Sequence, residues 1–462
     1  MDASSAALPG CFATCNTCGL HTSGNWIRRT SGAPYRLGNA QWGALGVRMK
    51  YDACDDPQRR RSAQVPKSTL RTLYDWVPQA CSLIELDHQL VCSIVRGKHI
   101  MVVGDSLAGQ LFLSLSSLLQ ATYGKNMKGS ALTDVTASAC NDTVRLEYAR
   151  NDLVMWSVAS SDFNKVSRFD ASLLLGPWAE RAARADVLII DSGHHFPHMA
   201  RKLAARQGTE MATTRATFPL RSINHTLANA VAARKYWGHH PSSLIMVSAP
   251  VPTKTCRRYH EPLTLDQALG AYHTVEGTLG EQKNATEFRP ELVEFWLQMY
   301  QQNTQSQWIS RNLGSSFVDI APLSIRRPDG MMAHHISVYD CLHSCLPGPT
   351  DTWSLLIFNQ LHALSPRLQA SATHTHPSHR TVRGAFDLTL NDWLSPAKSR
   401  SLFEACEHGG PRRHASLMNA TTERHKRQSS ALGPESQECA ITARMAPPLV
   451  HQEWWPFKNF IK

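Results

Sequence analysis

A serine suited to act as a nucleophile stands in the tripeptide Gly104-Asp105-Ser106, directly after the apolar run His99-Ile100-Met101-Val102-Val103. Leucines then recur at helical spacing at positions 107, 111, 115 and 118. The pattern predicts a strand, a tight turn and a helix, with the Ser106 hydroxyl at the carboxyl edge of a sheet. Backbone N–H groups at the start of the helix can stabilise an oxyanion there. The alternative is that Ser106 only caps the helix and Gly104 only turns the chain.

An acid and an imidazole lie three positions apart in Asp340-Cys341-Leu342-His343, so one helical turn or a tight loop brings both side chains to the same side. A serine hydroxyl is too weakly acidic to attack an ester unaided. It needs a neutral imidazole to take its proton and a carboxylate to fix the tautomer of that imidazole. The two motifs together favour a serine acyl-enzyme with Ser106 as nucleophile, His343 as base and Asp340 as the partner of the base.

Two histidine clusters offer weaker chemistry. His194, His195 and His198 follow a predicted strand, and loop residues that are capped or face a substrate explain them better than a metal site does. The histidine tract at residues 374–379 contains no cysteine or carboxylate that would complete a ligand set. We therefore expect no metal and no tightly bound cofactor.

The elements that must hold these residues follow from the apolar runs. Val187-Leu188-Ile189-Ile190 and Leu244-Ile245-Met246-Val247 are continuously apolar, which is typical of strands buried on both faces of a parallel sheet. Phe317-Val318-Asp319-Ile320 predicts an edge strand, and residues 291–302 are compatible with a helix. The predicted fold class is α/β, with a central, mainly parallel sheet between helices.

Composition divides the chain into three predicted parts. Residues 1–66 are predicted to form an irregular, disulfide-rich N-terminal cap, because Gly, Pro, Arg and Asp interrupt every apolar period from Cys11 to Pro66. Residues 67–365 are the predicted catalytic domain. Residues 366–462 are predicted to be a loosely ordered C-terminal extension, since they are rich in Arg and Ser and hold few apolar clusters.

The formal net charge of +11 favours an anionic partner. The basic residues are scattered, however, and form neither a basic helix nor a patch interleaved with aromatic residues. We therefore expect no nucleic-acid partner. An acidic polysaccharide or a membrane surface stays open, beside the simpler interpretation of a generally solvated basic face.

The 12 cysteines do not repeat as paired CxxC motifs, so disulfides explain them better than metal sites. Asn141, Asn224, Asn284 and Asn419 each begin an Asn-x-Thr sequon. Both features predict an oxidising lumen of the secretory pathway. Residues 1–10 hold no basic n-region and no apolar run long enough for a signal peptide or membrane helix. We therefore expect an N-terminal membrane anchor to be missing from this sequence; if the chain is complete, a cytosolic location competes.

Two segments resemble the paired signature of the trichome-birefringence-like family, a plant-type branch of the GDSL/SGNH esterase-like fold. The first runs from Val103 to Leu107, and the second, which is long and specific, from Tyr339 to Trp353. Further matches are Gly24-Asn25-Trp26, Tyr74-Asp75-Trp76-Val77-Pro78 leading to Cys81, Ser192-Gly193-His194, Val318-Asp319-Ile320 and Arg327-Pro328-Asp329-Gly330. The resemblance covers the chain from Gly24 to Leu361.

The resemblance implies an SGNH-hydrolase-like three-layer sandwich in a Golgi-resident type II membrane enzyme. Such enzymes move acetyl groups onto cell-wall polysaccharides such as xylan, mannan, xyloglucan or pectin. The implied partners are a polysaccharide acceptor and an acetyl donor, such as acetyl-CoA or an acetylated intermediate, used as a co-substrate. Ser106 would be the acetylated nucleophile, with His343 and Asp340 as its base system. Around the oxyanion and the substrate we place Gly104, Asp105, Asp191, Gly193 and His194.

The chain departs from the family pattern at two places. Ala108-Gly109-Gln110 stands where relatives usually have Asn-Arg-Asn, and Asp191 stands where they usually have Asn. We expect the first change to remove a polar contact, and the second to put a carboxylate where an amide donor would face the substrate. Cys341 and Cys345, on either side of His343, are interpreted as structural disulfide partners that stiffen its loop.

Three functions are compatible with these residues. In an O-acetyltransferase, Ser106 takes an acetyl group from a donor and a sugar hydroxyl then removes it. In a carbohydrate acetyl esterase with the same triad, water replaces the sugar. The third is a polysaccharide-binding protein that has kept the fold and lost catalysis, which the altered residues after Ser106 and at Asp191 motivate. The intact Ser, Asp and His set favours an enzyme, and transfer is the function that we predict.

Overall fold

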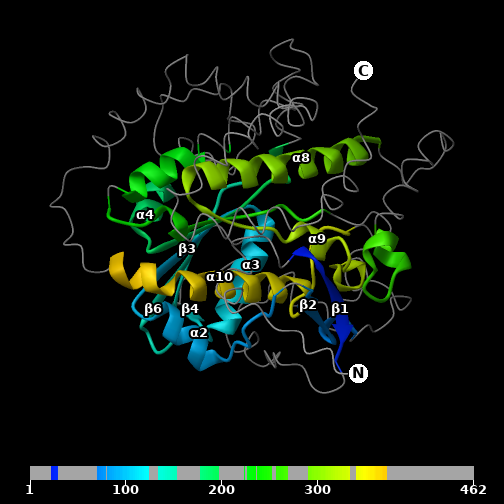
Figure 1. Ribbon diagram of the computed structural model, residues 1–462, viewed down its shortest axis with the longest axis horizontal. Helices are drawn as coiled ribbons and strands as arrows, with labels where there is room; N and C mark the ends of the chain where they lie inside the picture. Colours follow the sequence, from blue (N-terminus) through cyan, green and yellow to red (C-terminus); the bar gives the residue numbers. More distant parts are fainter. Residues whose placement is uncertain are drawn as a thin grey trace, which may run out of the picture. The chain divides into compact units, whose positions relative to one another are not determined.

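A seven-stranded sheet in the order β4-β5-β6-β3-β7-β8-β9 forms the centre of the protein (Figure 1). The computed structural model describes residues 22–29, 70–79, 81–123, 134–152, 177–196, 223, 226–235, 237–251, 256–268, 290–332 and 340–371. The parallel strands are β6 (Val144–Arg150), β3 (His99–Gly104), β7 (Val187–Asp191), β8 (Leu244–Val247) and β9 (Ser316–Val318). Strands β5 (Asp134–Ala139) and β4 (Thr122–Tyr123) add to β6 in antiparallel pairing. All described residues belong to one compact unit, Met1–Val382.

Helices cover both faces of the sheet, which gives three layers. Helices α2 (His88–Val95), α3 (Ser106–Leu118) and α10 (Pro349–Ser371) lie on one side, and α4 (Pro177–Arg184) and α8 (Pro290–Leu313) on the other (Figure 1). Strands β7 and β8 are buried along their whole length because helices shield both of their faces. Ile100 and Val102 of β3 share a core cluster with Leu111 of α3 and Leu361 of α10. The predicted α/β class with a mainly parallel sheet is confirmed.

The apolar runs form the strands that they predict. His99–Gly104, Val187–Asp191 and Leu244–Val247 are β3, β7 and β8, and the short edge strand is β9. The predicted helix at residues 291–302 is part of α8, and the leucine-spaced helix after the tripeptide is α3. Because β3, β7, β8 and β9 are parallel, their carboxyl ends meet at one edge of the sheet.

A two-stranded antiparallel sheet lies partly within the N-terminal segment that was expected to be irregular. Strand β1 (Gly24–Arg28) pairs antiparallel with β2 (Tyr74–Pro78), so the residues on either side of the predicted boundary at 66 join one sheet. Trp26 and Trp76 fix this small sheet to the rest of the fold. The guanidinium carbon of Arg327 lies 4.3 Å from the centroid of the Trp26 ring, and that of Arg326 lies 5.2 Å from the centroid of the Trp76 ring. The rest of the predicted cap lies outside the described residues.

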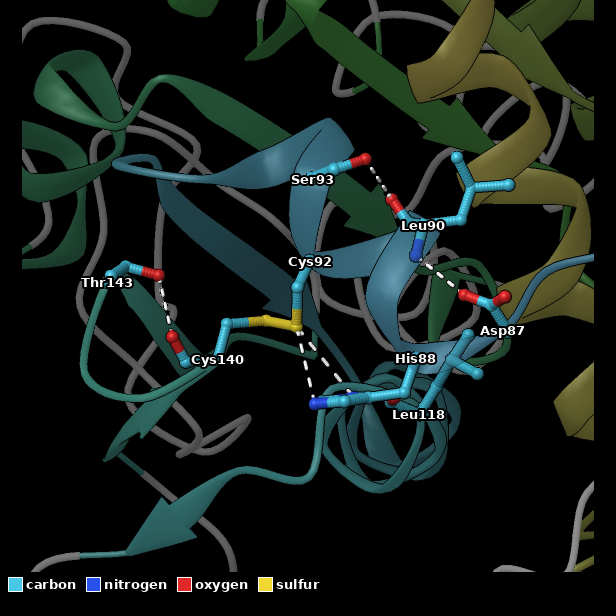
Figure 2. The surroundings of a disulfide bond; sticks show 8 residues. All are labelled: Asp87, His88, Leu90, Cys92, Ser93, Leu118, Cys140 and Thr143. Atoms are coloured by element: carbon cyan, nitrogen blue, oxygen red, sulfur yellow. Dashed lines mark hydrogen bonds between the residues drawn. A yellow bond between two sulfur atoms is a disulfide. The ribbon is translucent and has the colours of Figure 1, made fainter.

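Disulfide bonds join segments that regular hydrogen bonding leaves separate. Cys92 of α2 is bonded to Cys140, which begins the turn between β5 and β6 (Figure 2). In that turn Cys140, Asn141 and Asp142 have φ angles of 54°, 57° and 61°, a left-handed conformation that Asn and Asp adopt more readily than most residues. The six cysteines within the described ranges all take part in disulfides, which agrees with the expected disulfide-rich chain.

Helix α10 is the last element that the structure describes. Helix α10 continues to Ser371 and thus beyond the predicted domain end at residue 365. The predicted extension after that helix, with its histidine tract, lies outside the described residues. No helix in the described part of the chain combines the length and the apolar character needed to cross a bilayer.

Candidate active site

Ser106 is the first residue of α3 and follows directly on the end of β3. Gly104 makes this connection possible, because it has a φ of +156° and an added Cβ would overlap the carbonyl oxygen of Asp191 on the neighbouring strand. Asp105 caps the helix by accepting a hydrogen bond of 2.9 Å from the Leu107 amide. The local sequence therefore leaves the Ser106 side chain half-buried at the carboxyl edge of the sheet.

The structure brings Ser106, His343 and Asp340 into one hydrogen-bonded line. The Ser106 Oγ lies 2.7 Å from His343 Nε2, and His343 Nδ1 lies 3.0 Å from each carboxylate oxygen of Asp340. A proton on Nδ1 donates to Asp340, which leaves the lone pair of Nε2 to accept from the Ser106 hydroxyl. The same carboxylate accepts a 3.0 Å bond from the His343 backbone amide, so it fixes both the ring and the loop.

The segment that carries His343 is held by connections to distant parts of the chain. The Met332 amide donates to the His343 carbonyl, and the Cys345 amide donates to the Gly330 carbonyl, each at 2.9 Å. Cys341 is bonded to Cys256, and Cys345 takes part in a separate disulfide. The interpretation of these cysteines as structural is confirmed, although they are not bonded to each other.

Asp105 and His194 lie beneath the nucleophile and not toward solvent. Their side chains are 1% and 5% exposed, with Asp105 Oδ2 3.5 Å from His194 Nδ1. The His194 Nε2 lies 2.9 Å from the Pro250 carbonyl oxygen and donates to it. Burial alone would raise the pKa of Asp105, but the electrostatic interaction with His194, 3.5 Å away, outweighs it and holds that pKa below its usual range. Asp105 of this buried pair directly precedes Ser106 in the chain, and the pair lies on the side of the turn away from solvent.

Asp191 ends β7 directly beside Gly104 and is fully buried. Neither of its carboxyl oxygens has a hydrogen-bond partner among the described residues. Burial, reinforced by the negative charge of Asp105, raises the pKa of Asp191 well above its usual range. The pKa values of the two neighbouring carboxyl groups are therefore shifted in opposite directions, which favours a protonated Asp191 beside an ionised Asp105. Asp191, which was expected to face the substrate, is thus buried in the interior.

Gly193 and the neighbouring histidines close the site from the β7 side. An added Cβ at Gly193 would overlap the end of the Gln302 side chain on α8 and the Ala249 Cβ, so these neighbours would have to shift. His195 lies 3.9 Å from Asp152, and burial lowers the pKa of its imidazole. Within the described ranges, no three His, Cys, Asp or Glu side chains gather as a metal site requires. His198 lies outside those ranges.

Two contributions to the site were missed in the sequence. The end of β6 supports the turn, because the Asn151 amide donates to the Gly104 carbonyl and the Tyr148 hydroxyl donates to the Asp105 carbonyl, both at 2.8 Å. Gln110 of α3 bonds both backbone groups of Ser344, next to His343. Gln110, the last of the three residues that depart from the family pattern after Leu107, thus makes polar contacts of its own.

Comparison of the sequence with known proteins identifies three similar plant proteins. The chain is similar to probable xylan O-acetyltransferase 10 of Oryza sativa subsp. japonica, at 24% identity over 337 residues that cover 66% of this chain and 71% of the relative. It is 27% identical to protein trichome birefringence-like 13 of Arabidopsis thaliana, covering 63% of this chain and 73% of the relative. Xyloglucan O-acetyltransferase 1 of Arabidopsis thaliana is 22% identical, with 74% and 80% covered.

The family comparison spans both motifs and most of the sheet. The sequence pattern of the PC-esterase family matches residues 83–360, a range that contains Ser106, Asp340 and His343. The three-layer fold and the disulfides fit that assignment. The chain belongs to the PC-esterase family, the GDSL/SGNH-like acyl-esterases found in Pmr5 and Cas1p.

Proposed function

We propose that the chain is a serine acyl-transfer enzyme in which Ser106 is the nucleophile, His343 the general base and Asp340 the residue that orients the imidazole. The observation that carries this proposal is the line from Asp340 through His343 to Ser106, with contacts of 3.0 Å and 2.7 Å. A base takes the hydroxyl proton only through a lone pair directed at it. Membership in an acyl-esterase family supports the same chemistry.

In the first half-reaction, the Ser106 Oγ attacks the carbonyl carbon of an acetyl donor while its proton moves to His343 Nε2. The bond between the acyl carbon and the leaving atom of the donor then breaks, and that atom takes the proton from Nε2. Negative charge develops on the carbonyl oxygen near the N-terminus of α3, whose dipole stabilises it. The products are acetyl-Ser106 and the released donor, such as free coenzyme A.

In the second half-reaction, a hydroxyl group of a polysaccharide gives its proton to His343 Nε2 and attacks the acetyl carbon. The Ser106 Oγ–carbon bond breaks, and Oγ takes the proton back. A polysaccharide acceptor is proposed because the relatives named above include a probable xylan and a xyloglucan O-acetyltransferase. The same residues serve both halves, so the chain recovers its starting state after each transfer.

A second candidate is a carbohydrate acetyl esterase, in which water takes the place of the sugar hydroxyl. The side chains of His343 and Asp340 are 16% and 13% exposed, so water reaches this site in the absence of an acceptor. Transfer and hydrolysis differ in how well a bound acceptor excludes water. The departures that motivate an inactive binding protein leave the three-residue line intact.

The test is an acetyl-transfer assay with acetyl-CoA and a second, ester-type donor against a panel that includes xylan, xyloglucan, mannan and pectin. We expect acetyl groups on at least one glycan, with slow acetate release when no glycan is present. Acetate release that no glycan diverts would identify an esterase. Binding to a glycan with neither product, in a protein that also fails to acylate Ser106, would overturn both enzymatic candidates.

We also propose that the protein works in the secretory pathway, with the Golgi lumen as its site, and that it is a glycoprotein. The cysteines of the described ranges are oxidised, and two relatives are named as a probable xylan and a xyloglucan O-acetyltransferase. Asn141 heads a sequon on the turn between β5 and β6, and its side chain is exposed. Treatment with an N-glycosidase should increase the electrophoretic mobility of the native protein, and Asn141→Gln should remove part of that shift.

A further inference from the structure

Gln110 connects the helix of the nucleophile to the segment of the base. It lies one helical turn after Ser106 on α3 and is fully buried. Its Nε2 donates to the Ser344 carbonyl oxygen, and its Oε1 accepts a 3.2 Å bond from the Ser344 amide. One side chain therefore satisfies both backbone groups of the residue that follows His343.

The other edge of this segment explains why Ser344 needs such a partner. Met331 and Ser344 form an isolated antiparallel bridge, in which His343 and Cys345 bond to residues 330–332. Alternate residues of an extended segment direct their backbone groups to opposite sides, so the N–H and C=O of Ser344 point away from that bridge. The primary amide of Gln110 supplies the donor and the acceptor that a further strand would offer there. Leaving both groups buried without a partner would be costly.

We infer that Gln110 is a positioning residue, which sets the separation between the Ser106 hydroxyl and His343 Nε2 by clamping Ser344 to α3. The inference rests on the proposed role of Ser106 and His343. The clamp acts on the segment, whereas Asp340 acts on the ring. Without it, the segment keeps its bonds to residues 330–332, its disulfide to Cys256 and the disulfide of Cys345, but Ser344 loses both of its hydrogen bonds to α3.

A loss of this clamp should slow acylation more than it destabilises the fold. A displacement of about 1 Å between reacting groups can cost about 100-fold in rate. The substitution Gln110→Met keeps the length of the side chain and removes both hydrogen bonds. Gln360→Met is the matched control, because Gln360 is also a buried glutamine, and it bonds to Ser316 on the far side of the domain core from the triad.

The readout is covalent labelling of Ser106 by an alkyl fluorophosphonate, followed by mass spectrometry. The serine oxygen bonds to phosphorus, fluoride leaves, and His343 takes the hydroxyl proton, so the probe reports the first proton transfer alone. For Gln110→Met we expect the maximal labelling rate to fall about 100-fold, with the probe concentration for half-maximal rate unchanged. Gln360→Met should lower the thermal midpoint and leave the labelling rate at the parent value.

A second variant keeps the test decisive if Gln110→Met does not fold. The carboxyl group introduced by Gln110→Glu has the size of the amide, and when protonated it can donate to the Ser344 carbonyl. The ratio of the labelling rate of Gln110→Glu to that of the parent should therefore fall as the pH rises and the introduced carboxyl ionises.

The outcomes separate this inference from the proposed function. If the parent is labelled at Ser106 and Gln110→Met or Gln110→Glu is labelled at the parent rate with the parent pH profile, Gln110 is not a positioning residue and the triad still stands. If the folded parent is not labelled at Ser106 at all, the proposed nucleophile is wrong and this inference falls with it. Slower labelling of the Gln110 variants, with normal labelling of Gln360→Met, supports the clamp.

Discussion

The nucleophile and the base of the proposed triad are held in two different ways. Ser106 stands on the connection between β3 and α3, where the strand, the helix cap and the neighbouring strand ends fix the backbone. His343 stands in the segment 340–348, which forms no helix or strand and which two disulfides, a short bridge and the Gln110 side chain hold in place. Local structure positions one reacting group, and contacts from distant segments position the other.

This difference predicts different consequences for substitutions. Changes at the Ser106 turn should affect chemistry or folding as a whole, because the turn is part of the sheet core. Changes around His343 should affect the rate in graded steps, because several independent contacts share the work. The variants below test this comparison, from the largest expected effect to the smallest.

Replacement of the nucleophile should have the largest effect. Ser106→Ala should lower the turnover rate by a factor on the order of 10⁶, as loss of a triad serine does in serine proteases. The fold should remain, since Asp105 and not Ser106 provides the side-chain cap of α3. Acetyl transfer and circular dichroism measure the two effects. Ser114→Ala on the same helix is the control, and it should keep full activity.

Replacement of the carboxylate that orients His343 should come next. In Asp340→Asn the amide oxygen can still accept from the His343 backbone amide, so the loop should keep its shape. The ring then lacks a carboxylate for its Nδ1 proton, and the rate should fall by a factor on the order of 10⁴. Rate measurements across the pH range provide the test. A folded Asp340→Asn with nearly parental activity, beside an inactive His343→Ala, would show that another residue supplies the acid.

The disulfides allow a direct comparison of the two regions. Removal of the Cys256–Cys341 bond by a double Ser substitution should cost about 2–4 kcal/mol of unfolding free energy and also lower the turnover rate, because Cys341 adjoins the base segment. Removal of Cys92–Cys140, which is remote from His343, should cost a similar amount of stability and leave the rate unchanged. Urea unfolding and transfer assays on both variants separate these effects. Equal turnover rates in the two variants would contradict the claim that the Cys256–Cys341 disulfide helps to position His343.

The smallest effect concerns the pH dependence of stability. The pKa of Asp191 is raised in the folded protein, first by burial and then by the charge of Asp105. Its contribution to stability is therefore complete below the unfolded pKa of about 3.9 and is lost as the pH rises through the folded pKa. Asp191→Asn removes this loss, so the variant should be more stable than the parent at neutral and alkaline pH. The gain should be about 1.4 kcal/mol for each unit by which that pKa is raised.

Urea unfolding of the parent and of Asp191→Asn at a series of pH values measures this difference. The two curves should converge in acid and separate as the pH rises. Asp105 has the opposite sign, because its pKa is lowered in the folded state and its contribution fades as the pH falls. A constant difference between parent and variant at all pH values would mean that Asp191 is not a neutral buried acid.

The sequence predicted the parts of the fold that local pattern encodes. The apolar runs of β3, β7 and β8 are buried on both faces, so their continuous hydrophobicity identified them. Strand β5 was missed even though its residues alternate between exposed and buried, because Ala and Ser give only weak contrast along it. The two-stranded sheet of β1 and β2 was missed because its strands are short and lie far apart in the sequence.

The candidate site shows the same limit more sharply. The spacing of Asp340 and His343 predicted that their side chains lie together, and the structure places the His343 ring between Asp340 and Ser106. Gln110 could not be recognised from its type, because its partner Ser344 lies 234 positions away. The raised pKa of Asp191 depends on its burial inside the fold and on the charge of Asp105. Neither cause can be recognised from the residue types around position 191.

The most direct test of the account is to isolate the acyl-enzyme. The purified protein, incubated with an acetyl donor and no acceptor, should carry an acetyl group on Ser106 that peptide mass spectrometry locates. Addition of the acceptor glycan should remove it and acetylate the glycan, and His343→Ala should carry none. Transfer to glycan that proceeds without any acetyl group on Ser106, or acetylation at another residue that turns over at the catalytic rate, would contradict the proposed nucleophile.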